Sequence, residues 1–155
     1  MMHRQDASPL PSSIDPNWSI GIVYASFYKE ECEAIVASAR TTLLSAGISR
    51  ENIKLYPVYG SFEIPLIGAA LAEKKEVDAL IGIGIVVQGE TRHAQIIAEE
   101  AAAGMMQIQM RYQIPFAFEV LAVANIEQAR LRADRGAEAA RAVLHSLTSL
   151  KKIRA

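Results

Sequence analysis

The chain has 155 residues, of which 51% are hydrophobic and 21% are charged, and its formal net charge is −1. This composition predicts one folded domain with a real core and excludes a disordered chain. The charged residues form no basic stripe, which argues against a nucleic-acid partner, and no apolar run reaches the roughly 18–20 residues of a membrane span.

The start of the chain differs in composition from the rest. Residues 1–16 are polar, contain proline and lack the apolar core of a signal peptide, so they predict a flexible N-terminal arm ahead of a single domain over residues 17–155. The single cysteine, Cys32, excludes an intramolecular disulfide and fits a reducing compartment. We therefore expect a cytoplasmic protein.

Strands and helices are predicted to alternate along the chain. Residues 79–87 form a nearly continuous apolar run, typical of a strand covered on both faces, whereas apolar residues recur at helical spacing over residues 30–46. The predicted strands are residues 18–26, 53–58, 79–87 and 116–123. The predicted helices are residues 30–46, 65–75, 94–112 and a last one from residue 126 into the basic tail, with a break near residues 134–136.

This alternation predicts an α/β fold, in which helices flank a four-stranded parallel sheet. Ligands bind to such sheets beyond the carboxyl ends of the strands. Four segments should therefore meet at one edge of the sheet: residues 25–28, residues 59–63, residues 88–93 and the chain from residue 124 onward.

The strand-to-helix junction at residues 88–93, Gln-Gly-Glu-Thr-Arg-His, is a candidate anion site. A strand that opens straight into a helix leaves backbone N–H groups free for an anion, and His93 beside them can transfer protons near pH 7. The junction is neither a P-loop nor a dinucleotide fingerprint, because it has one glycine and no Gly-Lys-Ser/Thr. The alternatives are an ordinary turn with Thr91 as N-cap and an exposed histidine.

The other three segments also carry side chains suited to a ligand. Phe27 can stack on a planar heterocycle or pack the helix entry. Ser61 and Glu63 can hold polar groups, although Glu63 can equally complement the helix dipole. Arg130 and Arg132 lie two residues apart and point to different faces, so at most one is expected to face the site, where it could bind an anion. A solvated helix face is the favoured alternative for either one taken alone.

The sequence predicts no metal site, because one cysteine and three widely separated histidines do not supply a typical set of ligands. His3 and His145 are expected at the surface. The methionines Met105, Met106 and Met110 are expected in the core or at a subunit interface.

Taken together, four motifs resemble the 6,7-dimethyl-8-ribityllumazine synthase family, from about residue 19 to residue 147. They occur in family order: Gly60-Ser-Phe-Glu-Ile-Pro65, Gly89-Glu-Thr-Arg-His93, Glu99-Glu-Ala-Ala-Ala-Gly104 and Asn125-Ile-Glu-Gln-Ala129 followed by Arg132. The resemblance implies condensation of 5-amino-6-(D-ribitylamino)uracil with 3,4-dihydroxy-2-butanone 4-phosphate, without metal or organic cofactor. It also implies a three-layer flavodoxin-like sandwich and homo-oligomers built from pentamers.

The resemblance further implies a site between neighbouring subunits. The substrate-binding residues it implies are Phe27, Ser61, Phe62, Glu63, Val86, Val87, Gly89, Glu90, Thr91, Phe118 and Arg132. Phe27 would stack on the pyrimidine, residues 61–63 would hold the ribityl chain and residues 89–91 would bind the phosphate. His93 would be the catalytic residue that transfers protons. Phe118 and Arg132 would come from the adjacent subunit.

Three departures from the family pattern concern the same site. Tyr59 stands where the family usually has proline, and Glu119 replaces a small residue in the fourth strand. A carboxylate at position 119 must face a partner, water or a subunit contact. The segment after Arg132 is shortened, and Arg135 is the candidate to replace a family lysine near the phosphate.

Two other functions are compatible with parts of the pattern. One is a heterocycle-binding or shell-forming homologue with weak catalysis. The other is a flavodoxin-like nucleotide-binding domain, which is disfavoured because residues 25–28 lack a phosphate loop rich in Ser, Thr and Gly.

Overall fold

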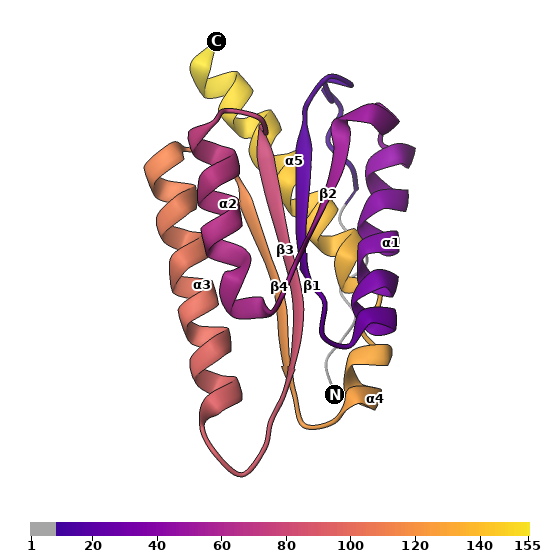
Figure 1. Ribbon diagram of the computed structural model, residues 1–155. Coiled ribbons are helices and arrows are strands. Elements are labelled where there is room, and N and C mark those ends of the chain that lie inside the picture. The colour runs from indigo at the N-terminus through magenta and orange to yellow at the C-terminus, as the bar shows by residue number, and fades with distance from the viewer. Residues whose placement is uncertain (1–8) are drawn as a thin grey trace.

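The computed structural model describes residues 9–155, whose four strands form one parallel sheet in the order β2-β1-β3-β4 (Figure 1). The strands are β1 (Ile20–Ala25), β2 (Ile53–Val58), β3 (Ala79–Val87) and β4 (Phe116–Val123). The helices are α1 (Lys29–Ser45), α2 (Ile64–Glu73), α3 (His93–Tyr112), α4 (Ile126–Arg130) and α5 (Arg135–Arg154), with the short 3-10 helices η1 (Arg50–Asn52) and η2 (Ser61–Glu63). The predicted α/β class and parallel sheet are confirmed.

Helices cover both faces of the sheet, which gives three layers (Figure 1). Helices α1 and α5 pack together on one face, and α2 and α3 pack together on the other. The central strand β3 serves both cores, because Ile81, Ile83 and Ile85 face α1 and α5 while Leu80 faces α2 and α3. This arrangement and the strand order agree with a flavodoxin-like sandwich.

The predicted bounds are confirmed for β2, β3 and β4, of which β2 and β4 are edge strands. β1 is shorter than the predicted residues 18–26. The predicted break in the last helix is present, but it lies at residues 131–134 and overlaps the predicted residues 134–136 only at residue 134. The reason is that Gly136 lies inside α5 and lets it approach α1: a Cβ atom there would lie 2.0 Å from the Ile35 carbonyl oxygen.

The start of the described chain lies against the domain. Ile14 packs on the core cluster of α1 and α5, the Pro9 carbonyl lies 2.8 Å from Nε2 of His145, and Nδ2 of Asn52 donates to the Pro16 carbonyl. His3 and the rest of residues 1–8 lie outside the described residues. Over residues 9–155, no helix combines the length and apolar character that a membrane crossing needs.

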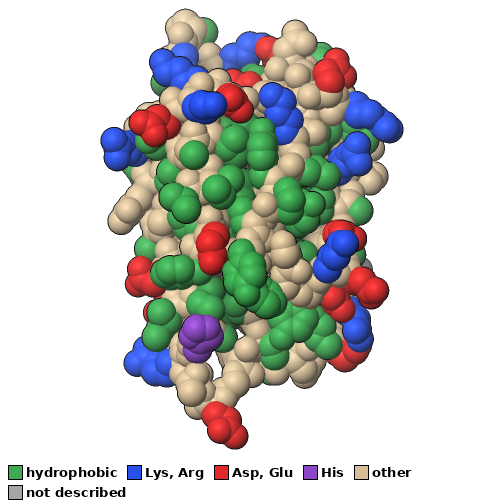
Figure 2. Space-filling view, in the orientation of Figure 1, with side chains coloured by type: hydrophobic (Ala, Val, Ile, Leu, Met, Phe, Trp, Pro, Cys, Tyr) green, Lys and Arg blue, Asp and Glu red, His purple; other side chains and the backbone are tan. Residues whose placement is uncertain are grey.

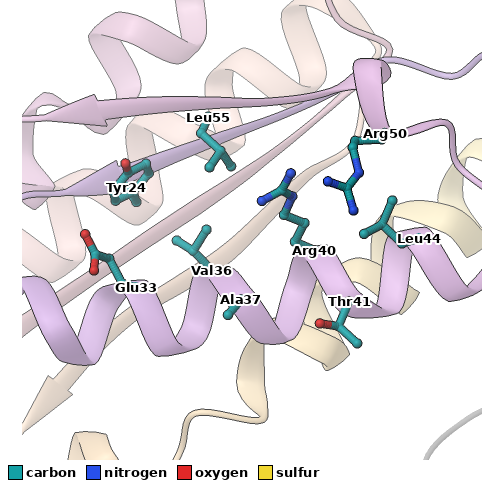
Figure 3. Close-up of a pocket in the computed structure, with 9 residues that line it drawn as sticks. All are labelled: Tyr24, Glu33, Val36, Ala37, Arg40, Thr41, Leu44, Arg50 and Leu55. Atoms are coloured by element: carbon teal, nitrogen blue, oxygen red, sulfur yellow. The ribbon is translucent and has the colours of Figure 1, made fainter.

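Most exposed large hydrophobic side chains fall into two groups by the elements that carry them. One group lies on β2, on the segments that follow β1 and β2, and on α2, and the other lies on α3 and the edge strand β4. The first comprises Phe27, Tyr28, Leu55, Tyr59, Phe62 and Leu66, and the second comprises Ile96, Met106, Met110 and Phe118. Figure 2 shows hydrophobic side chains gathered over the middle of one face. A separate pocket lies beside α1 (Figure 3).

Candidate active site

Hydrogen bonds at the carboxyl ends of the strands bring the predicted site segments to one edge of the sheet. The N–H and the hydroxyl of Ser26 both donate to the Val58 carbonyl, at 2.9 and 2.7 Å. The N–H of Gln88 donates to the Val123 carbonyl at 2.8 Å. The chain after β1 therefore leaves the sheet beside the chain after β2, and the chain after β3 leaves it beside the chain after β4.

Phe27 lies at this edge with an accessible ring. Its side chain is 52% exposed and meets Tyr59 edge-to-face, with ring centroids 5.1 Å apart. Gly60 has an extended backbone, and a Cβ atom there would lie 3.5 Å from the Phe27 ring. The close approach of residues 59 and 60 thus fixes one side of Phe27 and leaves surface for a planar ligand.

Ser61 and Glu63 carry buried polar atoms without protein partners. Ser61 is 5% exposed, and neither its hydroxyl nor Oε2 of Glu63 has a hydrogen-bond partner. The Ser61 hydroxyl lies against Gly84 of β3, where a Cβ atom would come within 2.1 Å of it. Buried polar atoms without partners cost about 1–3 kcal/mol each, so hydroxyl groups of a bound ligand would relieve that cost. Phe62 between them is exposed.

The end of β3 offers backbone groups to the same place. β1 pairs with β3 only as far as Ile83, whereas β4 continues to pair with β3 through Val87. Val86 and Val87 are half-buried, although the seven residues of β3 before them are buried. On the β1 side, the backbone of Val86 and Val87 therefore lies beyond the last strand pair.

The thiol of Cys32 contacts the backbone of Phe27. Sγ of Cys32 donates to the Phe27 carbonyl at 3.4 Å, and burial together with the neighbouring carboxylates raises the pKa of this thiol to about 12. Cys32 therefore remains a protonated donor and is not a nucleophile. The roles of Cys32 and Tyr59 in holding Phe27 are absent from the sequence prediction, because both contacts arise only when the ends of β1 and β2 meet.

The turn from β3 to α3 is open to solvent. Gly89, Glu90, Thr91 and His93 are all exposed, and no atom lies within 4 Å of the Cβ position of Gly89. The hydroxyl of Thr91 accepts the N–H of His93 at 3.3 Å. The expected alternative, Thr91 as the N-cap, was wrong by one position, because α3 begins at His93 rather than at residue 94 and Arg92 is its N-cap.

Helix α3 presents unpaired backbone donors at this turn. Its first intrahelical hydrogen bond runs from the Ile96 N–H to the Arg92 carbonyl at 3.0 Å. The N–H groups of Ala94 and Gln95 precede that bond and have no carbonyl one turn earlier to reach within the helix. Together with the dipole of a 20-residue helix, they favour an anion next to His93.

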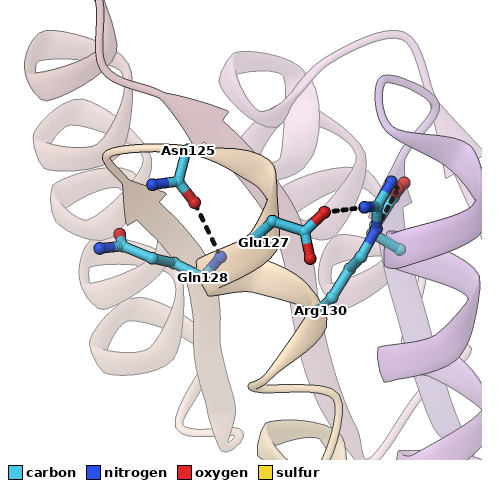
Figure 4. Close-up of polar contacts among 5 residues, drawn as sticks. Asn125, Glu127, Gln128 and Arg130 are labelled. Carbon is cyan, nitrogen blue, oxygen red and sulfur yellow. Dashed lines mark hydrogen bonds and ion pairs between the residues drawn. The ribbon is translucent and has the colours of Figure 1, made fainter.

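The two arginines after β4 have different surroundings. Asn125 caps α4 by accepting the Gln128 N–H at 3.2 Å, and Arg130 forms ion pairs with Glu127 and with Glu31 of α1 (Figure 4). Arg132 donates to the Gln128 carbonyl at 2.7 Å and has no carboxylate partner within residues 9–155. Of the two, Arg132 keeps guanidinium donors for an anion.

Phe118 does not join this cluster within one subunit. It lies on the edge strand β4, opposite Gly82 of β3, and is 42% exposed. Five residues separate it from the end of β4 at Val123, a distance of about 16 Å along a strand. Phe27 lies at the other end of the strands, beyond β1, so the two rings belong to different regions of one chain.

Glu119 faces α5 in a half-buried position. Burial raises its pKa to about 7, Arg135 opposes that rise, and Glu138 and Asp134 add to it. Arg135 itself pairs with Glu138 at 3.4 Å. The carboxylate expected to need a partner therefore lies within a small charged group at the start of α5. Within the described residues, no three His, Cys, Asp or Glu side chains form a potential metal site.

Comparisons with known proteins agree on one family. A family profile described as 6,7-dimethyl-8-ribityllumazine synthase matches residues 17–151. The chain is similar to curated proteins of that name from Paracidovorax citrulli (38% identical over 135 residues, 86% of this chain and 88% of the relative) and Verminephrobacter eiseniae (39% over 123 residues, 79% and 80%). A protein of the same name from Polaromonas sp. is 33% identical over 137 residues, 88% of this chain and 89% of the relative.

Proposed function

We propose that this chain, which belongs to the 6,7-dimethyl-8-ribityllumazine synthase family, carries out the family reaction at a site shared by two neighbouring subunits. The reaction condenses 5-amino-6-(D-ribitylamino)uracil with 3,4-dihydroxy-2-butanone 4-phosphate to 6,7-dimethyl-8-ribityllumazine, phosphate and water, in riboflavin biosynthesis. The observation that carries the proposal is the meeting of the family motifs around Ser61 and Gly89 at one edge of the sheet.

In this proposal, the residues at the carboxyl ends of β1, β2 and β3 bind the pyrimidine and its ribityl chain. The pyrimidine stacks on Phe27, and backbone groups of Val86 and Val87 contact its edge. The ribityl hydroxyls bond to residues 61–63, where the Ser61 hydroxyl and Oε2 of Glu63 lack protein partners. Satisfying these buried atoms stabilises the bound substrate and fixes its orientation.

The exposed turn binds the phosphate of the second substrate. Gly89, Glu90 and Thr91 surround it with backbone N–H groups and a hydroxyl, next to the positive end of α3. The amine of the uracil attacks the ketone, and loss of water gives an imine. Phosphate then leaves, and attack by the ribityl-bearing nitrogen with loss of a second water closes the ring.

His93 transfers the protons that these steps require, because imine formation and dehydration both move protons between nitrogen and oxygen. The anion that develops as phosphate leaves is stabilised by the helix N-terminus and by Arg132. Holding both substrates in a reactive orientation contributes most, since orientation is worth roughly 7–11 kcal/mol. The chemistry requires no metal or organic cofactor.

A neighbouring subunit completes the site. β2 and β4 are opposite edges of the sheet, with the exposed rings of Tyr59 and Phe62 beyond β2 and that of Phe118 on β4. Contact between these unlike edges of successive subunits forms a closed ring when the rotation between subunits closes. Leu55, on the α1 side of β2, lies outside this contact. Such a contact brings Phe118 and Arg132 of one subunit towards Phe27 and Gly89 of the next. We propose a pentameric ring as the basic assembly, and the cytoplasm as its location.

Two assays test these proposals. Purified protein mixed with both substrates should form lumazine, seen by absorbance and fluorescence; absence of product above the uncatalysed rate would refute the enzyme and leave a binding or shell-forming homologue.

The shared site is tested by co-assembling Arg132→Ala subunits with Glu63→Gln subunits, each impaired alone. Random mixing restores about one site in four if the two residues come from different subunits. No gain in activity on mixing contradicts the shared site.

A further inference from the structure

A pocket lies along α1, and its arginine end is distant from the candidate active site. Its volume is about 380 Å³, and it is bounded by α1, β1, β2 and the turn η1 before β2 (Figure 3). Val36, Leu44 and Leu55 supply its apolar part, Glu33 lies towards one end, and Arg40 and Arg50 lie towards the other.

Arg40 and Arg50 direct their guanidinium groups into the same space (Figure 3). Arg40 comes from the fourth turn of α1 and is half-buried, whereas Arg50 belongs to η1 and is exposed. Nε of Arg40 is buried and has no hydrogen-bond partner. An unsatisfied buried donor on a charged group is rare in folded proteins and indicates a missing ligand or water.

The positive charge of this pair has no acidic partner within residues 9–155. Glu33, the acid that lines the pocket, pairs with Lys29 at 4.0 Å. It lies seven residues before Arg40 on α1, about 10 Å along the helix axis, which exceeds ion-pair distance. Glu31, which also belongs to α1, pairs with Arg130.

We propose that this pocket binds a small organic anion, whose phosphate or carboxylate group lies between Arg40 and Arg50 and whose body rests on the apolar side chains. Two guanidinium groups match the oxygens of either anion with paired N–H donors, including the unsatisfied Nε of Arg40. Leu44, Leu55 and Val36 give a non-polar surface beside the charge, which favours an organic anion over a free inorganic one.

This site is separate from the proposed catalytic one. Arg50 precedes β2, so it lies near the amino ends of the strands, whereas residues 61–63 and 88–93 follow the carboxyl ends. The six residues of β2 alone span about 20 Å. Loss of the Arg40–Arg50 site should therefore leave the rate of lumazine formation unchanged.

Titration calorimetry with inorganic phosphate and with succinate tests the proposal. An Arg132→Ala background removes the main cationic side chain of the proposed phosphate site. In that background, each subunit should bind at least one of the two probes at one site, and Arg40→Gln/Arg50→Gln should weaken binding at least about tenfold. The charge-matched control Lys74→Gln/Lys152→Gln changes two exposed lysines and should bind as the background does.

The two probes separate the sources of the anion. If only phosphate binds, the natural ligand is assigned as a phosphate ester, and if only succinate binds, it is assigned as a carboxylate. Either result supports the site. Equal affinity before and after the arginine substitutions, or no binding of either probe to the background protein, overturns it. A change of assembly mass in the double variant without any anion binding also overturns it, because the pocket is then a subunit contact.

A second variant guards against misfolding. Arg40→Lys/Arg50→Lys keeps both positive charges but removes the paired N–H donors of the guanidinium groups. It should therefore fold normally and bind the probe several-fold more weakly than the background protein. Circular dichroism and light scattering on each variant establish that fold and mass are unchanged.

Discussion

The two halves of the candidate active site differ in how much of their structure one chain provides. Around Ser61, side chains are packed to the point that a single methyl group on Gly84 would clash with the hydroxyl. Around Gly89, the turn is fully exposed, and the Cβ position of the glycine meets no atom within 4 Å. One half is held by the core of the sheet, and the other projects beyond it.

One half of the site is therefore ordered before the ligand binds, whereas the other half is completed by the ligand and by a neighbouring subunit. The half near Ser61 holds its polar atoms in fixed positions before any ligand arrives, which lowers the entropy lost on binding. The turn at residues 88–92 supplies backbone donors, but its surroundings must come from the phosphate and from an adjacent subunit. Changes near Ser61 should therefore affect folding and binding together, while changes in the turn should affect phosphate binding and catalysis but leave folding unchanged.

The largest expected effect concerns Arg132 in the half that a neighbour completes. Arg132→Ala should lower kcat/KM for the phosphorylated substrate about a hundredfold, because it removes charge-assisted hydrogen bonds to the phosphate. Steady-state kinetics measure this. Arg130→Ala is the control: it breaks exposed ion pairs with Glu31 and Glu127 and should retain most activity. A fully active Arg132→Ala enzyme would show that this arginine does not bind the phosphate.

A pair of glycine substitutions compares the two halves directly. Gly84→Ala places a methyl group 2.1 Å from the Ser61 hydroxyl and should destabilise the protein by about 2 kcal/mol and weaken binding of the ribityl substrate. Gly89→Ala meets open space and no positive φ, so it should change stability by less than about 0.5 kcal/mol. Denaturant unfolding of both variants checks this, and equal stabilities would contradict the packing argument.

Glu119 tests the packing of α5 against the edge strand β4. Burial raises its pKa from an ordinary value of 4.5 to about 7, so the folded protein holds a proton that the unfolded chain releases. Its contribution to stability therefore falls as the pH rises from about 4.5 to 7 and stays low above that. Glu119→Gln cannot ionise and should be more stable than the parent protein by about 2 kcal/mol at pH 8, after allowance for partial exposure.

Unfolding at pH 4 and pH 8 measures that effect, since the gain from Glu119→Gln should vanish at pH 4. Glu100→Gln, on the exposed side of α3, serves as the control and should show no comparable pH dependence. An equal gain at both pH values would mean that the substitution acts through packing rather than ionisation.

The smallest effect is expected for His93 in the exposed turn. His93→Ala should reduce kcat about tenfold without abolishing turnover, because orientation of the substrates supplies more of the rate than proton transfer does. Stability should be unchanged, since the imidazole is exposed. Complete loss of activity with intact substrate binding would assign His93 a larger share of the chemistry.

The sequence predicted most of the architecture because periodicity reports burial. The bounds of β2, β3 and β4 were predicted as they occur, because periodic apolar residues and flanking turn signals mark short strands. The break between α4 and α5 was misplaced because Gly136 looks like a helix breaker locally, yet it serves a close contact with Ile35 on a distant helix.

The site was predicted as a set of segments rather than as a set of contacts. The sequence placed residues 25–28 and 59–63 at one edge of the sheet, but it did not indicate that Tyr59 meets Phe27 or that Cys32 bonds to the Phe27 carbonyl. Residue type and spacing did not distinguish Arg130 from Arg132, and only the resemblance to the family indicated Arg132. The partner of Arg130 is Glu31, which is 99 residues away in sequence.

By itself, therefore, the sequence determined the fold class, the family and the edge of the sheet where its motifs meet, because these depend on local periodicity and motif order. The tertiary structure decided which polar atoms are left without partners and which arginine is already paired. Those properties depend on contacts between distant segments, whose geometry no local pattern encodes. The same kind of contact buries Nε of Arg40 without a hydrogen-bond partner, a feature that no motif in the chain predicts.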